Sequence, residues 1–189
     1  RPEPRNAQPL TVRMRGGMQL SLAHNGNLTN AAELRAELED AGAIFQTTSD
    51  SEIFLHLISH CLKDMSLEEA ILSACDRVEG AYCLMIQAGG KLIAVRDPHG
   101  FHPLVMGRLG DAWVFASESC AFDLLEAERL RGVRPGEMVV IEHGALEYRS
   151  FALRKSAPVR QCIFELVYFA RPDSVIFGED VYQCRKRMG

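Results

Sequence analysis

The chain has 189 residues, enough for one domain with a sizeable core, and its 47% hydrophobic and 24% charged content is ordinary for a globular protein. Its net charge of -4 and the lack of any basic run give no electrostatic reason to expect nucleic acid or an anionic membrane as a partner. No apolar stretch approaches the roughly 18 residues that span a bilayer, and no signal peptide opens the sequence, so we expect a cytoplasmic protein.

Both ends of the sequence are typical of a piece of a longer chain. It begins at Arg1 in the loop-like stretch "RPEPRNAQPL" and stops at "VYQCRKRMG" without a recognisable closing element. The alternating apolar residues Met18, Leu20 and Leu22 predict a strand whose pairing partners lie partly upstream. We therefore expect a domain that is incomplete at its N-terminus.

Three amphipathic helices are predicted between residues 30 and 80, because apolar residues recur there at helical spacing. Each run starts at a residue that can cap a helix and has an acidic residue three positions later. The expected pairs are Asn30 with Glu33, Ser49 with Glu52, and Ser66 with Glu69. The first and third runs end at Gly42 and Gly80.

From Ala81 onward the hydrophobic period changes to that of strands. The predicted strands are, in order, residues 81–87, 92–97, 103–107, 111–117, 136–143 and 145–151. The turns between them are too short for parallel crossovers, so the strands should pair in antiparallel fashion. The sequence thus predicts an α+β fold with helices packed on antiparallel sheet.

The stretch "LAHNGNLTN", residues 22–30, gathers hydrogen-bond donors where the first strand ends and the first helix begins. Asn25 offers a side-chain amide, and Gly26 offers a backbone N–H that no side chain obstructs. Donors fixed in this way can form an oxyanion hole, which stabilises the negative charge that develops during acyl transfer. Asn-Gly is also among the commonest turn dipeptides, so a plain turn explains the same residues.

Asp50 stands at the start of the second predicted helix, which leaves two interpretations open. An acidic side chain there interacts favourably with the helix dipole and needs no function. Alternatively, Asp50 presents its carboxylate to the ammonium group of a ligand, and the helix start then lowers the pKa of Asp50 and keeps it ionised.

Other motifs give little evidence of chemistry. His56 and His60 have the i, i+4 spacing of a metal pair but lack the Glu of H-E-x-x-H. The segment "RDPHG", residues 96–100, is either a structural turn or a support for an active-site loop. The six cysteines are widely spaced without a C-x-x-C pair, which predicts neither a disulfide framework nor a zinc site. The sequence therefore has an oxyanion-hole candidate but no convincing nucleophile.

Seven short blocks of the sequence carry a family resemblance when they are taken together. They are "NAQP" at 6–9, "AHNGNLTN" at 23–30, "TTSDSE" at 47–52, "RDPHGFHPL" at 96–104, "ASES" at 116–119, "RPGEMVVI" at 134–141 and "CIFELVYFARPDS" at 162–174. In this order they resemble the glutaminase domain of the amidophosphoribosyltransferase family, over nearly the whole chain. The Asn-Gly and S-D-S-E blocks are shared across the N-terminal-nucleophile amidotransferases, whereas "FELVYFARPDS" is much more specific to the phosphoribosyl enzymes.

The resemblance implies a fold and a reaction. The fold would be of the N-terminal-nucleophile type, a four-layer αββα sandwich of antiparallel sheets. Residues 1–157 would be the glutaminase domain without its N-terminal segment, and residues 158–189 would lead into a phosphoribosyltransferase domain. The full-length enzyme would hydrolyse glutamine and pass the ammonia to phosphoribosyl pyrophosphate, giving 5-phosphoribosylamine in the first committed step of purine synthesis.

The same resemblance implies roles for individual residues. Asn25 and Gly26 would be the oxyanion-hole donors, and Asp50 would hold the α-amino group of glutamine. The expected nucleophile is an N-terminal cysteine whose own α-amino group acts as the general base. Neither that cysteine nor the arginine of an H-x-R-Y-S-T segment, which would bind the glutamine carboxylate, occurs in this sequence. We therefore expect these residues alone to be inactive.

Cofactors and partners are implied mainly for the rest of the enzyme. Mg²⁺ would accompany phosphoribosyl pyrophosphate in the phosphoribosyltransferase domain, and the full-length enzyme would be a homo-oligomer. Cys162 matches a cysteine that in some members of the family ligates a [4Fe–4S] cluster, whose other ligands come from the downstream domain. Two alternatives stay open: a non-catalytic glutaminase-like binding or regulatory module, and another class II glutamine amidotransferase.

Overall fold

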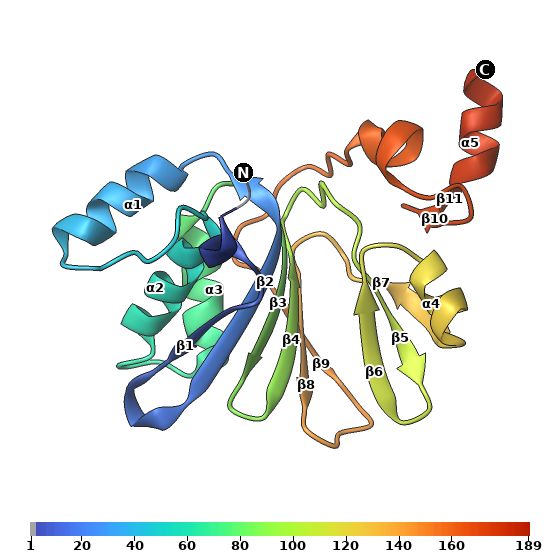
Figure 1. Cartoon of the computed structure of the whole chain (residues 1–189). Coiled ribbons are helices and arrows are strands. Elements are labelled where there is room, and N and C mark those ends of the chain that lie inside the picture. The colour runs from blue at the N-terminus through green and yellow to red at the C-terminus, as the bar shows by residue number, and fades with distance from the viewer. Residues whose placement is uncertain (1–2) are drawn as a thin grey trace.

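A computed structural model describes residues 3–189, and Figure 1 shows two sheets side by side with helices on their outer sides. The helices are α1 (Ala31–Asp40), α2 (Ser51–Cys61), α3 (Leu67–Arg77), α4 (Cys120–Leu125) and α5 (Val181–Met188), with 3-10 turns at Pro4–Asn6 and Arg15–Gly17. The strands are β1 (Leu10–Arg13), β2 (Gln19–Leu28), β3 (Gly80–Ala88), β4 (Lys91–Arg96), β5 (Val105–Leu109), β6 (Ala112–Ala116), β7 (Glu128–Gly132), β8 (Glu137–Glu142), β9 (Arg149–Ala152), β10 (Val175–Ile176) and β11 (Glu179–Asp180).

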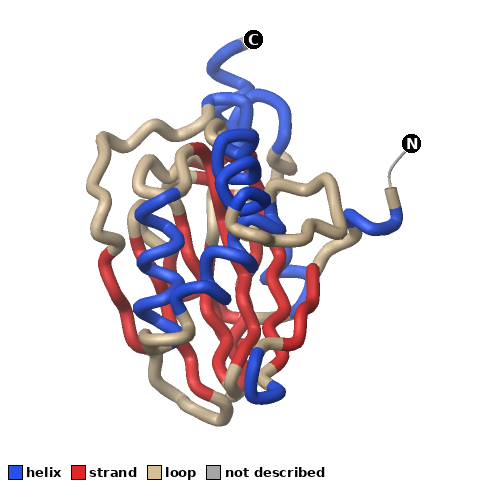
Figure 2. The backbone as a smooth tube through the Cα atoms, turned by 90° about the vertical axis from the view of Figure 1, so that its left-hand side faces the viewer, coloured by secondary structure: helices blue, strands red, loops and turns tan. Residues whose placement is uncertain are grey.

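The larger sheet has six strands in the order β1-β2-β3-β4-β8-β9, and a second sheet has the order β6-β5-β7. Every strand pair in both sheets is antiparallel. Helices α1 to α3 cover one face of the larger sheet, while the smaller sheet faces its other side and carries α4 outside (Figure 1). Figure 2 shows the same helices in front of the strands. The predicted α+β class and the αββα layer order are therefore confirmed.

Two hydrophobic cores hold these layers together. The first lies between the helices and the larger sheet, and it includes Leu84, Ile93 and Val140. The second lies between the two sheets and consists of Cys83, Ala94, Leu104, Met106, Val133, Val139 and Ile141. Neighbouring residues of β3, β4 and β8 thus enter opposite cores, which explains their nearly continuous apolar sequences. Burial of each large aliphatic side chain contributes about 1.5–3 kcal/mol.

The three predicted helices all exist, but only one begins as expected. Ser66 and Glu69 form the predicted capping box at α3. Glu52 instead accepts hydrogen bonds from the backbone N–H groups of Gln46 and Thr47, at 2.8 and 2.7 Å, so it does not return to Ser49. The Asn30 side chain likewise does not cap α1, because it bonds the backbone at the end of α3.

Several elements were not predicted. Strands β1 and β7 and helices α4 and α5 are short or polar, and the stretch before Met18 was interpreted as loop. The C-terminal stretch, where no element was expected, forms helix α5. Asp180 caps this helix by accepting a hydrogen bond from the Gln183 N–H at 2.8 Å. Residues 145–148 precede β9 rather than belonging to it.

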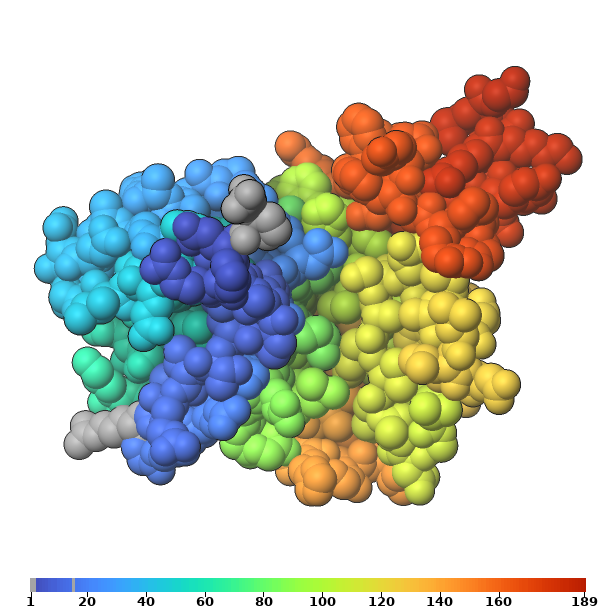
Figure 3. Space-filling model, in the orientation of Figure 1, coloured from blue at the N-terminus to red at the C-terminus, as the bar shows by residue number. Residues whose placement is uncertain are grey.

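Residues 158–189 lie along the top of the smaller sheet and α4, coloured orange to red in Figure 3. They include a π-helix at Glu165–Phe169, followed by the β10–β11 hairpin and α5. The Glu118 carboxylate accepts hydrogen bonds from the Arg171 N–H at 2.7 Å and the Ser174 hydroxyl at 2.9 Å. This segment is therefore fixed to the sandwich by specific bonds, while its assignment as the link to a further domain stays a prediction.

Candidate active site

Asn25 and Gly26 do not form a turn, which corrects the simpler interpretation of this dipeptide. Both lie within β2, where they pair with Cys83 and Tyr82 of β3. Gly26 has a φ of 151°, and a Cβ atom there would lie 2.0 Å from the Ala81 carbonyl oxygen. Only glycine allows the two strands to approach so closely at this point.

The direction of the Gly26 N–H follows from the strand register. The Thr29 N–H donates to the Glu79 carbonyl, so these two residues, directly after β2 and before β3, continue the ladder as a hydrogen-bonded pair. In an antiparallel ladder such pairs alternate with pairs that point their backbone groups to the opposite edge. The backbone groups of His24, Gly26 and Leu28 therefore face away from β3, toward the side on which β1 lies.

Two of these three edge positions are occupied by side chains. The His24 N–H donates to Gln8 Oε1 at 2.5 Å, and the Leu28 N–H donates to Asp50 Oδ2 at 2.8 Å. Among residues 3–189, no side chain accepts from the Gly26 N–H, which the register directs away from β3, and the exposed Asn25 side chain makes no hydrogen bond. One rigid strand thus presents two free donors next to each other.

Asp50 lies beside these donors as an ionised group. It immediately precedes α2, and its Oδ1 is 3.6 Å from Nδ1 of His24. Burial opposes ionisation, but hydrogen bonds from His24 and from the Leu28 and Ser51 N–H groups hold the pKa of Asp50 below its ordinary value. The predicted lowering of the pKa is confirmed in direction, and most of its causes lie outside the helix start. The half-buried carboxylate can therefore receive a cationic ligand group at neutral pH.

A polar network behind the strand, buried at His24 and Ser51 and reached by the exposed Gln8, was not predicted from the sequence. His24 is 8% exposed and Ser51 is 1% exposed, and His24 Nδ1 lies 3.1 Å from Ser51 Oγ. Gln8 Nε2 donates to the His24 carbonyl oxygen at 3.0 Å and lies 3.4 Å from Ser51 Oγ. The available signal was the block "NAQP", which lies far from β2 in sequence and indicates no contact by itself.

A model of the family described as "Glutamine amidotransferase domain" matches residues 2–123. The chain belongs to the glutamine amidotransferase domain family. This match covers β1 to β6 and the first part of α4, including the free donors of β2 and Asp50.

Curated relatives extend the similarity of this glutamine amidotransferase domain to its C-terminal segment. The chain is 46% identical to "Amidophosphoribosyltransferase 2, chloroplastic" of Arabidopsis thaliana over 98% of its own length and 32% of the relative. It is 42% identical to amidophosphoribosyltransferase of Bacillus subtilis, over 97% of its own length and 38% of the relative. The chain thus spans about a third of the length of these relatives.

Solved structures agree with the fold. The structure of glutamine phosphoribosylpyrophosphate amidotransferase from B. subtilis, complexed with ADP and GMP, superposes with a TM-score of 0.89 at 42% identity. That comparison covers 94% of this chain and 38% of the other. A class-II glutamine aminotransferase domain protein from Silicibacter pomeroyi, with a TM-score of 0.53 at 20% identity, shares the fold. The predicted N-terminal-nucleophile sandwich is therefore confirmed.

Metal sites are not evident in the part of this amidotransferase domain that the structure describes. No group of three or more His, Cys, Asp or Glu side chains that could hold a metal occurs in residues 3–189. His56 instead packs on Phe45 and lies 3.7 Å from Glu52. Cys162, the candidate cluster ligand, donates its backbone N–H to the Phe101 carbonyl at 3.0 Å. These residues by themselves do not fit a [4Fe–4S] cluster, which needs four ligands.

The segment "RDPHG" forms a turn that is bonded to the surrounding backbone, as the simpler of its two interpretations expects. Asp97 is fully buried and accepts hydrogen bonds from the N–H groups of His99 and Gly100, at 2.9 and 2.8 Å. Arg96 donates to three backbone carbonyl oxygens of the loops around it. The Arg96 and Asp97 side chains of this turn are thus directed inward.

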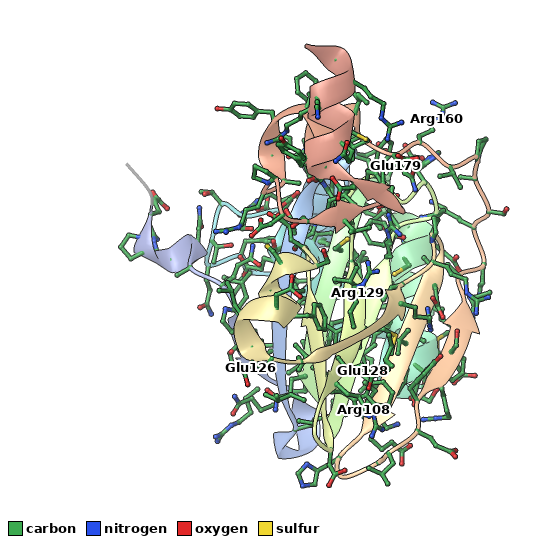
Figure 4. The ribbon with its side chains drawn as sticks, turned by 90° about the vertical axis from the view of Figure 1, so that its right-hand side faces the viewer. Arg108, Glu126, Glu128, Arg129, Arg160 and Glu179 are labelled. Atoms are coloured by element: carbon green, nitrogen blue, oxygen red, sulfur yellow. The ribbon has the colours of Figure 1, made fainter. Side chains whose placement is uncertain are left out.

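The surface of the smaller sheet carries charges of both signs. Figure 4 shows Arg108, Glu128 and Arg129 on its strands and Glu126 at the end of α4. Mixed charges of this kind do not create a field of one sign.

No helix of residues 3–189 is both long and apolar enough to cross a membrane.

Proposed function

We propose that this chain is the glutamine-hydrolysing part of an amidophosphoribosyltransferase. The proposal is supported by relatives with that name, which match the chain over nearly all of its length. In such an enzyme, ammonia released from glutamine displaces pyrophosphate from phosphoribosyl pyrophosphate and gives 5-phosphoribosylamine. Glutamine is then the ligand of this chain, and phosphoribosyl pyrophosphate is the substrate of the remaining part.

The observation that carries the proposal is the pair of free donors, Asn25 and Gly26, beside the ionised Asp50. When a thiolate attacks the side-chain amide of glutamine, a sulfur–carbon bond forms and the carbonyl electrons move onto the oxygen. Donors that are fixed before the reaction and aimed at this oxygen lower the barrier. The Gly26 N–H and the Asn25 amide supply such donors, and Asp50 anchors the α-ammonium group.

The remaining steps use groups that the family resemblance implies. The N-terminal cysteine of the full-length protein forms the thioester, and its α-amino group passes a proton to the departing ammonia. Water then hydrolyses the thioester to glutamate. Mg²⁺ at the phosphoribosyl site, a cluster ligand role for Cys162, a homo-oligomeric state and a cytoplasmic location stay predictions.

The proposal is tested by measuring glutamate release from glutamine, and pyrophosphate release from phosphoribosyl pyrophosphate, with the full-length protein that contains this chain. We expect both activities in the wild type. Replacement Asn25→Ala should reduce kcat for glutamate release by about 10²- to 10³-fold, equivalent to about 2.7–4 kcal/mol in the barrier. Unchanged turnover in this variant would contradict the assigned donor role.

The same assay separates the alternatives. A non-catalytic glutaminase-like module would bind glutamine without releasing glutamate. Another class II amidotransferase would release glutamate but would not consume phosphoribosyl pyrophosphate. Either result would replace the proposed function while leaving the family membership intact.

A further inference from the structure

The side of strand β2 that faces away from β3 changes its bonding partner halfway along the strand. Strand β1 pairs with it only as far as Leu10 opposite Leu22. Beyond that point the Gln8 side chain takes the place of a strand. Its amide accepts from the His24 N–H at 2.5 Å and donates to the His24 carbonyl at 3.0 Å, as an opposing peptide group would.

This arrangement brackets the proposed oxyanion donor. The Gln8 side chain bonds the β2 backbone at His24, two residues before Gly26. Asp50 bonds it at Leu28, two residues after Gly26. The Gly26 N–H is the next edge-facing group on either side. Its direction is therefore set by the two side chains that fix its neighbours.

The Gln8 side chain is also connected to Asp50 through Ser51. Gln8 Nε2 and His24 Nδ1 both lie within 3.4 Å of Ser51 Oγ, and Ser51 directly follows Asp50. Ser51 Oγ further accepts from the Ser49 hydroxyl at 2.9 Å. Ser51 is 1% exposed and His24 is 8% exposed, so the contact between His24 Nδ1 and Ser51 Oγ is shielded from water, while Gln8 reaches it from the exposed side.

From these contacts we infer that Gln8 is a positioning residue for the oxyanion hole. This inference rests on the proposed glutaminase function. In this role Gln8 acts through β2, because its side-chain bonds go to the His24 backbone and to Ser51. It holds β2 so that the Gly26 N–H points at the developing oxyanion, and a small change in that direction weakens transition-state stabilisation more than glutamine binding.

The test uses the full-length protein with Gln8→Met, which has nearly the same length but cannot hydrogen-bond to His24. We expect kcat for glutamate release to fall by about 10- to 100-fold, with a much smaller change in KM. Gln8→Glu keeps an acceptor for the His24 N–H but places an oxygen against the His24 carbonyl, so we expect a similar loss. If Gln8→Met does not fold, the Gln8→Glu variant provides the same measurement.

Thr11→Val is the matched control. Thr11 Oγ1 lies 2.9 Å from Ser21 Oγ, a side-chain bond between β1 and β2 that is remote from Gly26. This variant loses one bond of the same edge and should keep wild-type kcat. An equal loss of kcat in Thr11→Val would show that any loosening of β1 slows the reaction, and it would overturn the specific role of Gln8.

An aldehyde analogue of glutamine gives a second readout. The nucleophile thiol of the full-length enzyme adds to the aldehyde of glutamate γ-semialdehyde: sulfur bonds to carbon, and the thiol proton passes to the former carbonyl oxygen. That oxygen occupies the oxyanion position. We expect Gln8→Met to weaken inhibition by this aldehyde about 10-fold or more while inhibition by glutamate, the product, is unchanged.

The outcomes separate the two proposals. An inactive wild-type protein would contradict the proposed function. An active wild type whose Gln8→Met and Gln8→Glu variants keep wild-type kcat and aldehyde inhibition would overturn the positioning role alone. Equal weakening of aldehyde and glutamate inhibition would also overturn it, because Gln8 would then support the binding site as a whole.

Discussion

The segments at residues 24–28 and 96–100 both combine glycine with hydrogen-bonding side chains, yet they use their donors in opposite ways. In the second, Arg96 and Asp97 are 5% and 0% exposed and bond to the surrounding backbone. In the first, the Asn25 amide and the Gly26 N–H face outward without partners among the described residues. A closed polar turn stabilises the fold, whereas a rigid strand with open donors can stabilise a ligand.

The largest effect is expected from Gly26→Ala, which changes the segment at residues 24–28 with its open donors. Its Cβ would lie 2.0 Å from the Ala81 carbonyl, so β2 and β3 must separate. We expect the free energy of unfolding to fall by about 3 kcal/mol and kcat for glutamate release to fall by about 10³-fold. Chemical denaturation and the glutaminase assay measure the two effects. Gly144→Ala is the control, because Gly144 has a φ of 74° but open space around it. It should lose only stability.

Asp97→Ala changes the segment at residues 96–100, whose polar groups are bonded to the surrounding backbone. It leaves buried N–H groups of residues 99 and 100 without their acceptor, which should lower the free energy of unfolding by about 3 kcal/mol. The folded protein should keep kcat within about threefold of wild type, since the Asp97 carboxylate is fully buried and bonds the backbone of its own turn. Denaturation curves combined with activity per folded molecule test this. A large fall in kcat would mean that the turn acts on the site.

Asp50 and Asp97 should respond to acid in opposite directions. The pKa of Asp50 lies below its ordinary value of 3.8, so its contribution to stability is present above that value and is lost as pH falls through its folded pKa. Burial raises the pKa of Asp97, so protonation of Asp97 favours the folded state as pH falls toward 3.8. Urea denaturation between acid and neutral pH should show a flatter acid loss in Asp50→Asn and a steeper one in Asp97→Asn.

Asp50→Asn should also raise KM for glutamine, by about 10- to 100-fold, because an ammonium group loses its charged partner. A KM equal to that of wild type would contradict the assigned role of Asp50. The same steady-state measurement gives kcat, which should change less than KM.

The smallest effect is expected from Asn27→Ala, on the other side of Gly26. Asn27 makes one weak contact, from Nδ2 to the Leu28 carbonyl at 3.4 Å, and is exposed. Stability should stay within about 0.5 kcal/mol of wild type, with kcat nearly unchanged. Steady-state kinetics beside Asn25→Ala tests this contrast. Equal losses in the two variants would mean that the two asparagines share one role.

Local patterns predicted most of the larger sheet and its helices. The Ser66–Glu69 capping box was found because both partners are near in sequence. The Ser49–Glu52 box was wrong because Glu52 instead binds the backbone of Gln46 and Thr47, which local pattern alone does not exclude. Short polar elements such as β7 have no hydrophobic period, so pairing with β5 alone determines them.

The candidate site was predictable only in part. The motif match pointed to Asn25, Gly26 and Asp50, and the structure brings all three together at the end of β2. The strand conformation of Gly26 was not predictable from Asn-Gly, because the same dipeptide favours turns. Gln8 was not predictable as a neighbour of His24, because 16 residues and a strand pair separate them.

The two side chains at the free edge of β2 also bear on whether another molecule can add a strand there. A bare run of backbone donors and acceptors on a sheet edge is a template on which another molecule can add a strand. With Gln8 bound at His24 and Asp50 bound at Leu28, a single peptide N–H lies open between two occupied positions. A small carbonyl compound can reach it, but an extended polypeptide finds no continuous row to bond. The edge therefore leaves one backbone donor open but presents no continuous row for strand addition.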